Sequence, residues 1–335
     1  MELVCPAGNF PSLRAAVDAG ADAVYIGFRD ETNARRFPGL NFDPETARRG
    51  VAYAHERGRR VFAAINTYAQ AGRWPEWEAA VDTAAAVGVD ALIVADVAVL
   101  DHARRRHPDL PLHLSVQASA TNPAALRYYR ERFGVRRAVL PRVLSLAQIR
   151  RVAGEGDLPL EVFGFGGLCI MAEGRCHLSS YLTGESPNRN GICSPAWAVR
   201  WSQTDDTVEA RLNDVLIDRY GPGEQAGYPT LCKGRFRVPG HAGGRAFHAL
   251  EEPTSLNSLA CLPELHAAGV AAVKIEGRQR SPAYVARVTA VWRRAIDHLL
   301  AAPARFAVSG EWQRTLAGLS EGTQTTLGAY HRSWQ

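Results

Sequence analysis

The feature that most limits the possible folds is a repeated unit, in which a short apolar segment is joined to a stretch of helical periodicity. Apolar strands that alternate with helices are typical of parallel βαβ units, whose strands are buried on both faces. Eight such strands predict an α/β protein built as a TIM-type (β/α)8 barrel, regular or distorted. An open doubly wound sheet is the alternative, although no GxGxxG sequence follows the first strand. The predicted strands are Leu3–Cys5, Ala23–Gly27, Val61–Ile65, Ala91–Ala95, Leu112–Val116, Ala138–Leu140, Leu160–Phe165 and Ala271–Ile275.

Two of the predicted helices begin with a capping residue followed by proline, at Asp43-Pro44 and Asn122-Pro123. This pair is a strong start signal, because the cap bonds a free backbone N–H and proline has none to leave unbonded. The predicted helices are Phe10–Ala19, Pro44–Gly58, Trp74–Val87, Val97–Arg106, Pro123–Gly134, Leu146–Ala153, Ser258–Ala268 and Pro282–Leu300.

The strand–helix rhythm stops for about a hundred residues between the seventh and eighth strands. An insertion after a barrel strand emerges at the C-terminal face of the barrel, where such enzymes carry their chemistry. We therefore divide the chain into a barrel (1–166 and 256–302), a cysteine-rich α+β insertion (167–255) and a C-terminal tail (303–335). Within the insertion, residues 198–203 and 211–217 are predicted to be strands of a small β subdomain.

Four of the six cysteines, Cys169, Cys176, Cys193 and Cys232, lie in this insertion, in loops rich in glycine and proline. Four thiolates are the usual ligand set of an iron–sulfur cluster or of a tetrahedral zinc ion. Their spacing contains no CxxC, which argues against a zinc ribbon or a thioredoxin motif. The other two cysteines, Cys5 and Cys261, lie in apolar segments and are expected to be buried packing residues.

Polar residues also follow several predicted strands, where they would ring the mouth of a barrel and line a substrate pocket. Asp96 is the one most easily explained as a helix cap. Glu161 differs because it lies inside an apolar strand, where a carboxylate must be paired. We favour a structural ion pair for it over a catalytic role. No catalytic residue can be assigned at this point; the candidates are Glu161, Arg142, Glu276 and Arg278.

The net charge is +5, and nearly all of the basic residues are arginines that scatter along the chain. We read this excess as compositional and expect no nucleic acid partner, since a dedicated site would concentrate the charge. The N-terminus has no basic region followed by an apolar stretch, and acidic residues interrupt the longest apolar tracts. These features predict a cytoplasmic, non-membrane protein, in which cysteines serve metal binding or catalysis rather than disulfides.

The sequence EVFGFGGLCIMAEGRCHLSS, residues 161–180, resembles the signature of the U32 peptidase family. The resemblance extends over nearly the whole chain and is strongest to the branch that acts in oxygen-independent ubiquinone biosynthesis (UbiU-type). Four further segments carry it: Met1–Gly8, Ser179–Asn188, Cys193–Ala196 and Gly227–Phe236. The name "peptidase" has little support in the residues, because no Ser/His/Asp or HExxH arrangement stands out.

This resemblance implies a [4Fe–4S] cluster held by Cys169, Cys176, Cys193 and Cys232. It also implies an oxygen-independent hydroxylase that modifies the quinone-precursor ring, with prephenate as the oxygen donor. The expected partners are a homologous, UbiV-like subunit in a heterodimer and a lipid-binding accessory protein that presents the quinone precursor. Other family members hydroxylate tRNA or rRNA, which is the alternative function. A U32-type peptidase or a zinc-stabilised barrel is a weaker alternative.

Overall fold

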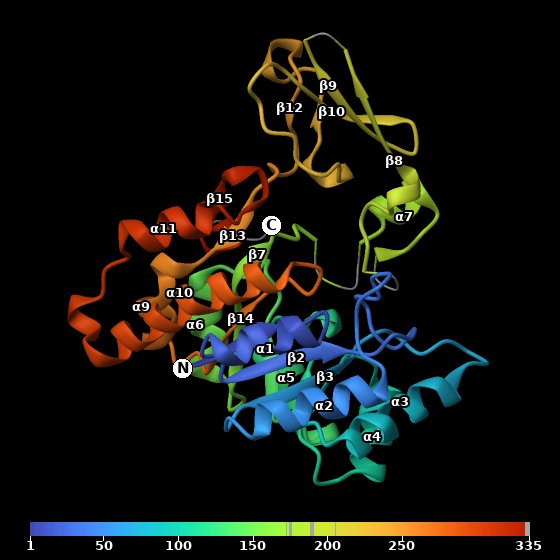
Figure 1. Ribbon diagram of the computed structural model, residues 1–335, viewed down its shortest axis with the longest axis vertical. Helices are drawn as coiled ribbons and strands as arrows, with labels where there is room; N and C mark the ends of the chain where they lie inside the picture. Colours follow the sequence, from blue (N-terminus) through green and yellow to red (C-terminus); the bar gives the residue numbers. More distant parts are fainter. Residues whose placement is uncertain (172, 174–175, 188–190, 205, 332–335) are drawn as a thin grey trace.

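The computed structural model describes residues 1–171, 173, 176–187, 191–204 and 206–331. Eight parallel strands form a closed barrel, because β7 pairs with both β6 and β14, and β14 pairs with β1 (Figure 1). The predicted TIM-type barrel is therefore confirmed, and the open doubly wound sheet is wrong. The barrel strands are β1 (Glu2–Pro6), β2 (Ala23–Gly27), β3 (Arg60–Ile65), β4 (Ala91–Val94), β5 (Leu112–Leu114), β6 (Arg137–Val139), β7 (Leu160–Gly167) and β14 (Ala272–Ile275).

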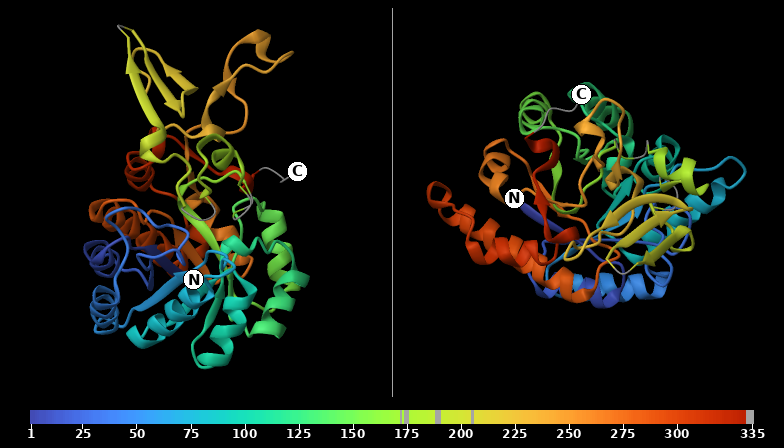
Figure 2. Two further views of the ribbon diagram at one scale, coloured as in Figure 1. Left: turned by 90° about the vertical axis from the view of Figure 1, so that its right-hand side faces the viewer. Right: turned by 90° about the horizontal axis from the view of Figure 1, so that it is seen from above.

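Helices cover the outside of the barrel, and Figure 2 shows them around it with the insertion rising from one end. The two predicted helix starts are confirmed: the Asp43 side chain accepts from the Thr46 N–H, and the Asn122 side chain accepts from the Ala125 N–H. The helices around the barrel are α1 (Phe10–Asp18), α2 (Pro44–His55), α3 (Trp74–Val87), α4 (Val97–Arg106), α5 (Pro123–Phe133), α6 (Leu146–Glu155), α9 (Leu262–Ala267) and α10 (Pro282–Ala301). No helix of the described residues is long and apolar enough to cross a membrane.

Alternate positions of the barrel strands point to two different apolar clusters. One set, which includes Leu3, Val24 and Val273, belongs to the large cluster that also contains the helix residues. The other set forms a separate, smaller cluster in the barrel interior, made of Val4, Ala23, Tyr25, Phe62, Ala64, Ala91, Ile93 and Ala272. The interior is thus packed solid, and space for a ligand has to be sought at the ends of the barrel.

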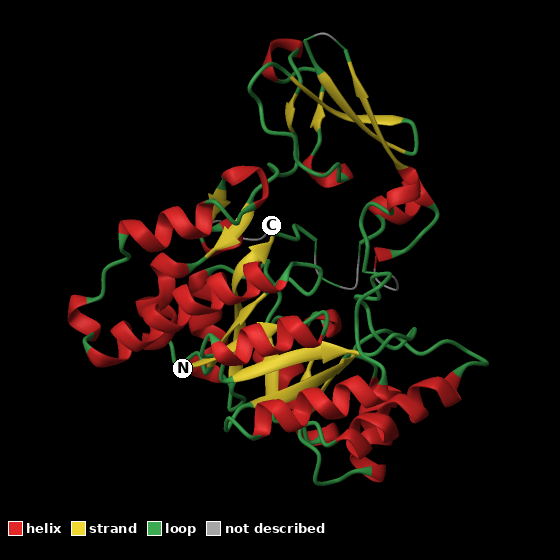
Figure 3. Ribbon diagram, viewed as in Figure 1, coloured by secondary structure: helices red, strands yellow, loops and turns green. Residues whose placement is uncertain are grey.

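The insertion contains α7 (Leu178–Thr183) and an antiparallel sheet of β8 (Val199–Gln203), β9 (Val208–Leu212) and β10 (Val215–Tyr220). The single strand predicted over residues 211–217 is wrong, because the chain turns back at Asn213 and Asp214. Both residues have positive φ, 46° and 65°, as tight hairpin turns require. Figure 3 shows this outer part of the molecule as strands joined by loops and short helical turns. A second, two-stranded sheet pairs β11 (Arg235–Phe236) with β12 (Phe247–His248).

Two short strands lie beside the last residues of β7 and widen the sheet there. β13 (Ser255–Asn257) pairs antiparallel with the last residues of β7, and β15 (Thr325–Thr326) from the tail pairs with β13. The tail helix α11 (Gly310–Ala317) packs on α10, and the buried Tyr330 hydroxyl donates to the Phe163 carbonyl at 2.6 Å. The tail is therefore fastened to β7, the strand that leads into the first insertion cysteine.

A candidate cysteine site at the mouth of the barrel

A cavity of about 1270 Å³, open to solvent on one side, lies at the C-terminal ends of the barrel strands and is lined by barrel loops, the insertion and the tail. All four of the insertion cysteines line it. Cys169 follows β7, Cys176 precedes α7, Cys193 follows the glycine-rich loop at Gly191, and Cys232 lies in the short 3-10 turn Leu231–Lys233. Three segments of the chain, of which the first carries both Cys169 and Cys176, therefore contribute cysteines to the lining of one cavity. Cys5 and Cys261, by contrast, are buried in the apolar core.

Burial and mutual repulsion make these thiols poor acids in the absence of a cation. Burial raises the pKa of Cys169 and of Cys232 to about 12, and the other thiols of the group add to the effect at Cys232. Burial likewise raises the pKa of Cys193, with Cys176 contributing. These electrostatic contacts indicate that the four sulfur atoms are neighbours. A metal centre supplies the positive charge that would keep such thiols deprotonated.

The donor set consists of four thiols, the ligand type of iron–sulfur clusters and of zinc. Among the described residues, no group of three or more His, Cys, Asp or Glu residues is arranged to hold a metal ion. A [4Fe–4S] cluster takes one thiolate at each iron, so its ligands lie around a space instead of converging on a point. The four thiols around one cavity match that requirement.

Close backbone contacts hold the cysteine loops in place. Gly191 has φ 67°, and a Cβ atom added there would lie 1.7 Å from the Ala34 carbonyl oxygen. Only glycine allows the Cys193 loop to approach the barrel loop this closely. The Ser194 hydroxyl donates to the Pro229 carbonyl, which joins the Cys193 segment to the segment that leads to Cys232.

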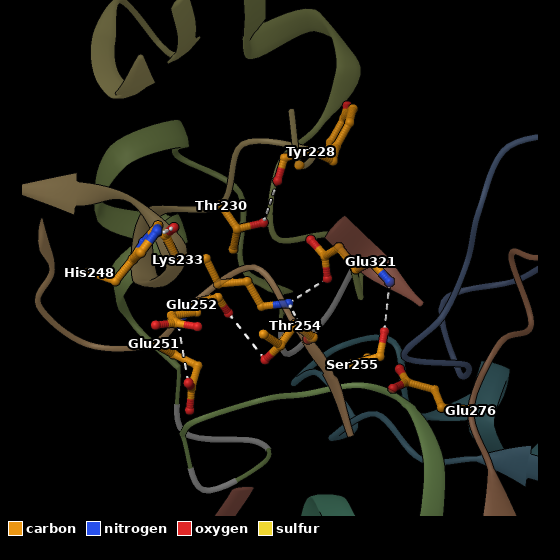
Figure 4. Close-up of polar contacts among 12 residues, drawn as sticks. Tyr228, Thr230, Lys233, His248, Glu251, Glu252, Thr254, Ser255, Glu276 and Glu321 are labelled. Carbon is orange, nitrogen blue, oxygen red and sulfur yellow. Dashed lines mark hydrogen bonds and ion pairs between the residues drawn. The ribbon is translucent and has the colours of Figure 1, made fainter. Parts of the chain in front are cut away.

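Lys233, beside Cys232, ties this turn to the tail (Figure 4). Its ammonium lies 2.5 Å from the Glu321 carboxylate and 3.3 Å from the Thr254 carbonyl. The Glu321 N–H in turn donates to the Ser255 hydroxyl at 2.9 Å. Lys233 is buried, so this pair is shielded from solvent and fixes the position of the cysteine turn.

Arg142 and Glu276, both candidates from the sequence, meet beneath the cysteines. Arg142 donates to Glu276 at 2.7 Å, to Glu173 at 2.8 Å and to the Gly167 carbonyl at 2.7 Å, and it stacks on the Phe163 ring. Burial alone would raise the pKa of Glu276, but Arg142, Arg35 and Lys233 together outweigh burial and hold the pKa below its ordinary value. For Glu173 burial prevails and raises the pKa despite Arg142.

Glu161 lies inside the barrel and lines neither cavity at the mouth. Its carboxylate bonds Lys274 at 2.7 Å and Arg137 at 3.3 Å. Burial would raise the pKa of Glu161, but these two cations outweigh it and lower the pKa. The geometry accords with a structural ion pair. Asp96 caps α4, since it accepts from the Ala98 N–H at 2.7 Å.

Arg278 lines a smaller recess of about 60 Å³, to which Arg142 and Glu276 also contribute, but it does not line the large cavity. Its guanidinium donates to the Asn33 side chain at 2.9 Å, and burial lowers its pKa to about 10. The sequence reading missed Asn33, Arg35, Glu173 and Glu321 as parts of the mouth. The pairing of Lys274 with Glu161 could have been predicted from the sequence. A lysine in an apolar strand needs an acidic partner, just as Glu161 needs a basic one.

The family model for peptidase family U32 matches residues 8–333, which is nearly the entire chain. The chain belongs to peptidase family U32. The U32 assignment confirms the resemblance that was drawn from residues 161–180.

Two curated relatives of this U32 chain carry the same kind of name. It is 32% identical over 316 residues to "tRNA hydroxylation protein P1" of Bacillus subtilis, covering 94% of this chain and 67% of that protein. It is 32% identical over 314 residues to "tRNA hydroxylation protein P" of Escherichia coli, covering 88% and 68%. A solved structure, the U32 peptidase Mk0906, overlaps 49% of this chain and 68% of its own at 17% identity, with a TM-score of 0.41.

Proposed function

We propose that this U32 chain is the iron–sulfur subunit of an enzyme that hydroxylates an aromatic ring without molecular oxygen. The observation that carries the proposal is the convergence of Cys169, Cys176, Cys193 and Cys232 on one cavity at the barrel mouth. A [4Fe–4S] cluster bound there would supply electron transfer, since four protein ligands leave no iron free for a substrate. The large cavity beside the thiols would hold the ring.

The hydroxylation balances without an external oxidant if a donor supplies the oxygen. The ring exchanges a hydrogen for the hydroxyl group of the donor, and the donor receives the hydrogen. In this proposal the donor is prephenate, as the family resemblance implies. The chain's own residues would bind and orient the two reactants.

A nucleobase of RNA is the acceptor that the curated relatives favour, since both are named for tRNA hydroxylation. This support is stronger than the support for the quinone assignment, and it speaks against the expectation of no nucleic acid partner. The cavity wall also carries cationic side chains that could meet phosphates, namely Arg29, Arg36 and Arg280.

The quinone-precursor ring is the second candidate acceptor. Three of the segments that resemble the ubiquinone branch supply lining residues of the large cavity, among them Ser179, Ser194 and Tyr228. The cavity wall has apolar side chains suited to an uncharged ring, including Leu168, Met171 and Ile192. In this version a homologous UbiV-like subunit completes a heterodimer, and a lipid-binding accessory protein delivers the precursor.

Exposed aromatic side chains on the insertion support the subunit proposal. Tyr181 is 93% exposed, and Trp197 and Tyr228 are each about half exposed. Aromatic residues of this kind are typical anchors of protein interfaces.

Deleting the gene in the parent organism and growing the strain with and without oxygen tests the function. Mass spectrometry of quinones and of tRNA nucleosides is the readout, with the Cys193→Ala variant as the control for complementation. Under-hydroxylated quinone precursors only without oxygen would support the second acceptor, and loss of a hydroxylated nucleoside would support the first. If both pools stay normal in the absence of oxygen, the proposal fails.

A further inference from the structure

Two arginines in the recess at the barrel mouth lack an acidic partner. Arg278 is 4% exposed and Arg35 is half-buried, and both line the recess of about 60 Å³. Within the described part of the chain, neither guanidinium forms an ion pair. Burying an arginine without a counter-charge costs several kcal/mol, so the arrangement is favourable only when an anion is supplied from elsewhere.

The neighbouring cations are already matched. Lys274 pairs with Glu161 at 2.7 Å, and Arg142 pairs with Glu276 and Glu173. Glu276 is the one carboxylate of the described residues that lines the recess; it bonds Arg142 at 2.7 Å, and Arg35 acts on it only from a longer distance, where it helps to lower the pKa of Glu276. Four cations, Arg35, Arg142, Lys274 and Arg278, thus face three carboxylates, Glu161, Glu173 and Glu276, which leaves the recess one positive charge in excess.

The position of Arg278 is built into the surrounding structure. The Asn33 side-chain oxygen accepts from Arg278 and from the Arg35 N–H, so one amide holds both arginine residues. Asn33 is fixed in turn, because its NH₂ group donates to the Phe28 carbonyl and to Asn41. Gly27 leaves room for both side chains: a Cβ atom there would lie 2.2 Å from the Asn33 Nδ2 atom and 2.5 Å from the Arg278 Nη1 atom.

The recess opens toward the cysteine cavity. Arg35, Gln117, Arg142, Glu276 and Gln279 line both spaces. The Gln117 side chain is buried, and its oxygen has no hydrogen-bond partner among the described residues. The recess has room for a carboxylate group but not for a ring, whose place would be in the cavity beside the thiols.

We propose that Arg278 and Arg35 bind the carboxylate of a small organic acid, whose body extends into the cavity beside the four cysteines. The planar fork of a guanidinium matches a carboxylate with two parallel hydrogen bonds. The recess is too narrow and too deeply set for the backbone of an RNA helix. The inference rests on the proposed function for the role of the acid as a reactant at this site.

The test uses 4-fluorobenzoate as a ¹⁹F NMR probe on the full-length, anaerobically purified protein, with neutral 4-fluorobenzamide as its match. We expect the acid to bind and the amide to bind at least tenfold more weakly. Arg278→Met should weaken acid binding about tenfold or more, because charge-assisted hydrogen bonds are lost. Arg105→Met, an exposed arginine on α4, is the matched control and should bind within about twofold of the native protein.

If Arg278→Met does not fold, Gly27→Ala and Arg35→Gln replace it in the binding measurement. In Gly27→Ala the added methyl group should displace the Asn33 amide together with the Arg278 guanidinium that it holds, and so weaken binding with the total charge unchanged. Equal binding of the acid and the amide, or native affinity in both Arg278→Met and Gly27→Ala, would overturn the proposal. Displacement of the probe by bulk tRNA but not by unlabelled benzoate would also overturn it, in favour of a phosphate subsite. Retained brown colour in these variants separates a failure of this site from a failure of the cluster proposal.

Discussion

The Arg142 guanidinium lies 2.7 Å from the Glu276 carboxylate, although 134 residues separate the two in sequence. The same guanidinium donates to the carbonyl of Gly167, two residues before Cys169. One side chain therefore connects the loop after β6, the end of β14 and the segment that carries the first cysteine. The cysteine site is supported from below by a buried ion-pair network.

Replacing Arg142 with methionine should strongly destabilise the protein. Glu276 and Glu173 would lose their cation, and breaking a buried pair from one side typically costs about 3–5 kcal/mol. Urea unfolding under anaerobic conditions measures the loss. Arg151→Met, at an exposed i,i+4 pair with Glu155, is the control and should change stability by less than about 0.5 kcal/mol. Equal effects of the two substitutions would show that the network contributes nothing.

Gly191→Ala should loosen the Cys193 loop and reduce the iron content. The added methyl group would collide with the Ala34 carbonyl, and the positive φ adds about 1–2 kcal/mol of strain. Gly223→Ala is the matched control, because Gly223 also has positive φ, 79°, but has open space around its Cβ position. Iron per chain, measured after anaerobic purification, should fall in the first variant and stay native in the second. Native iron content in Gly191→Ala would refute the close approach of the two loops.

His113 should make the barrel less stable in weak acid. Burial, with a smaller contribution from Arg137 and Lys274 and opposed by Glu161, lowers the pKa of His113 from 6.5 to about 3. Its ring packs edge-on against Phe62 inside the barrel. The unfolded chain therefore binds a proton that the folded chain rejects, and stability present above pH 6.5 is lost as pH falls toward 3.

The loss approaches about 1.4 kcal/mol per pH unit within that window. Urea unfolding at pH 7.5, 6.5 and 5.5 should show a steeper decline for the native protein than for His113→Gln. Parallel pH dependences would mean that His113 is not buried in its neutral form.

Much of this architecture could be predicted from local sequence. The alternating pattern located all eight barrel strands, and Asp43 and Asn122 marked helix starts because capping depends only on neighbours in sequence. The four insertion cysteines stood out because each lies beside glycine- and proline-rich loops, away from apolar strands. The hairpin at Asn213 and Asp214 was missed, although two consecutive turn-forming residues were its signal.

Contacts between distant segments could not be predicted in this way. Asn33 meets Arg278 across 245 residues, and Lys233 meets Glu321 across 88. Two-residue strands such as β15 have no periodicity that a sequence pattern could display. These contacts depend on the closure of the barrel, which brings the ends of all its strands to one mouth.

The most direct test of the account is the iron and acid-labile sulfide content of the anaerobically purified protein and its cysteine variants. The native protein should be brown and carry about four iron and four sulfide per chain. Replacing Cys169, Cys176, Cys193 or Cys232 with alanine should bleach it, whereas Cys5→Ala and Cys261→Ser, both in the apolar core, should keep the colour. A colourless protein with one zinc ion, or bleaching by Cys261→Ser alone, would contradict the proposed ligand set.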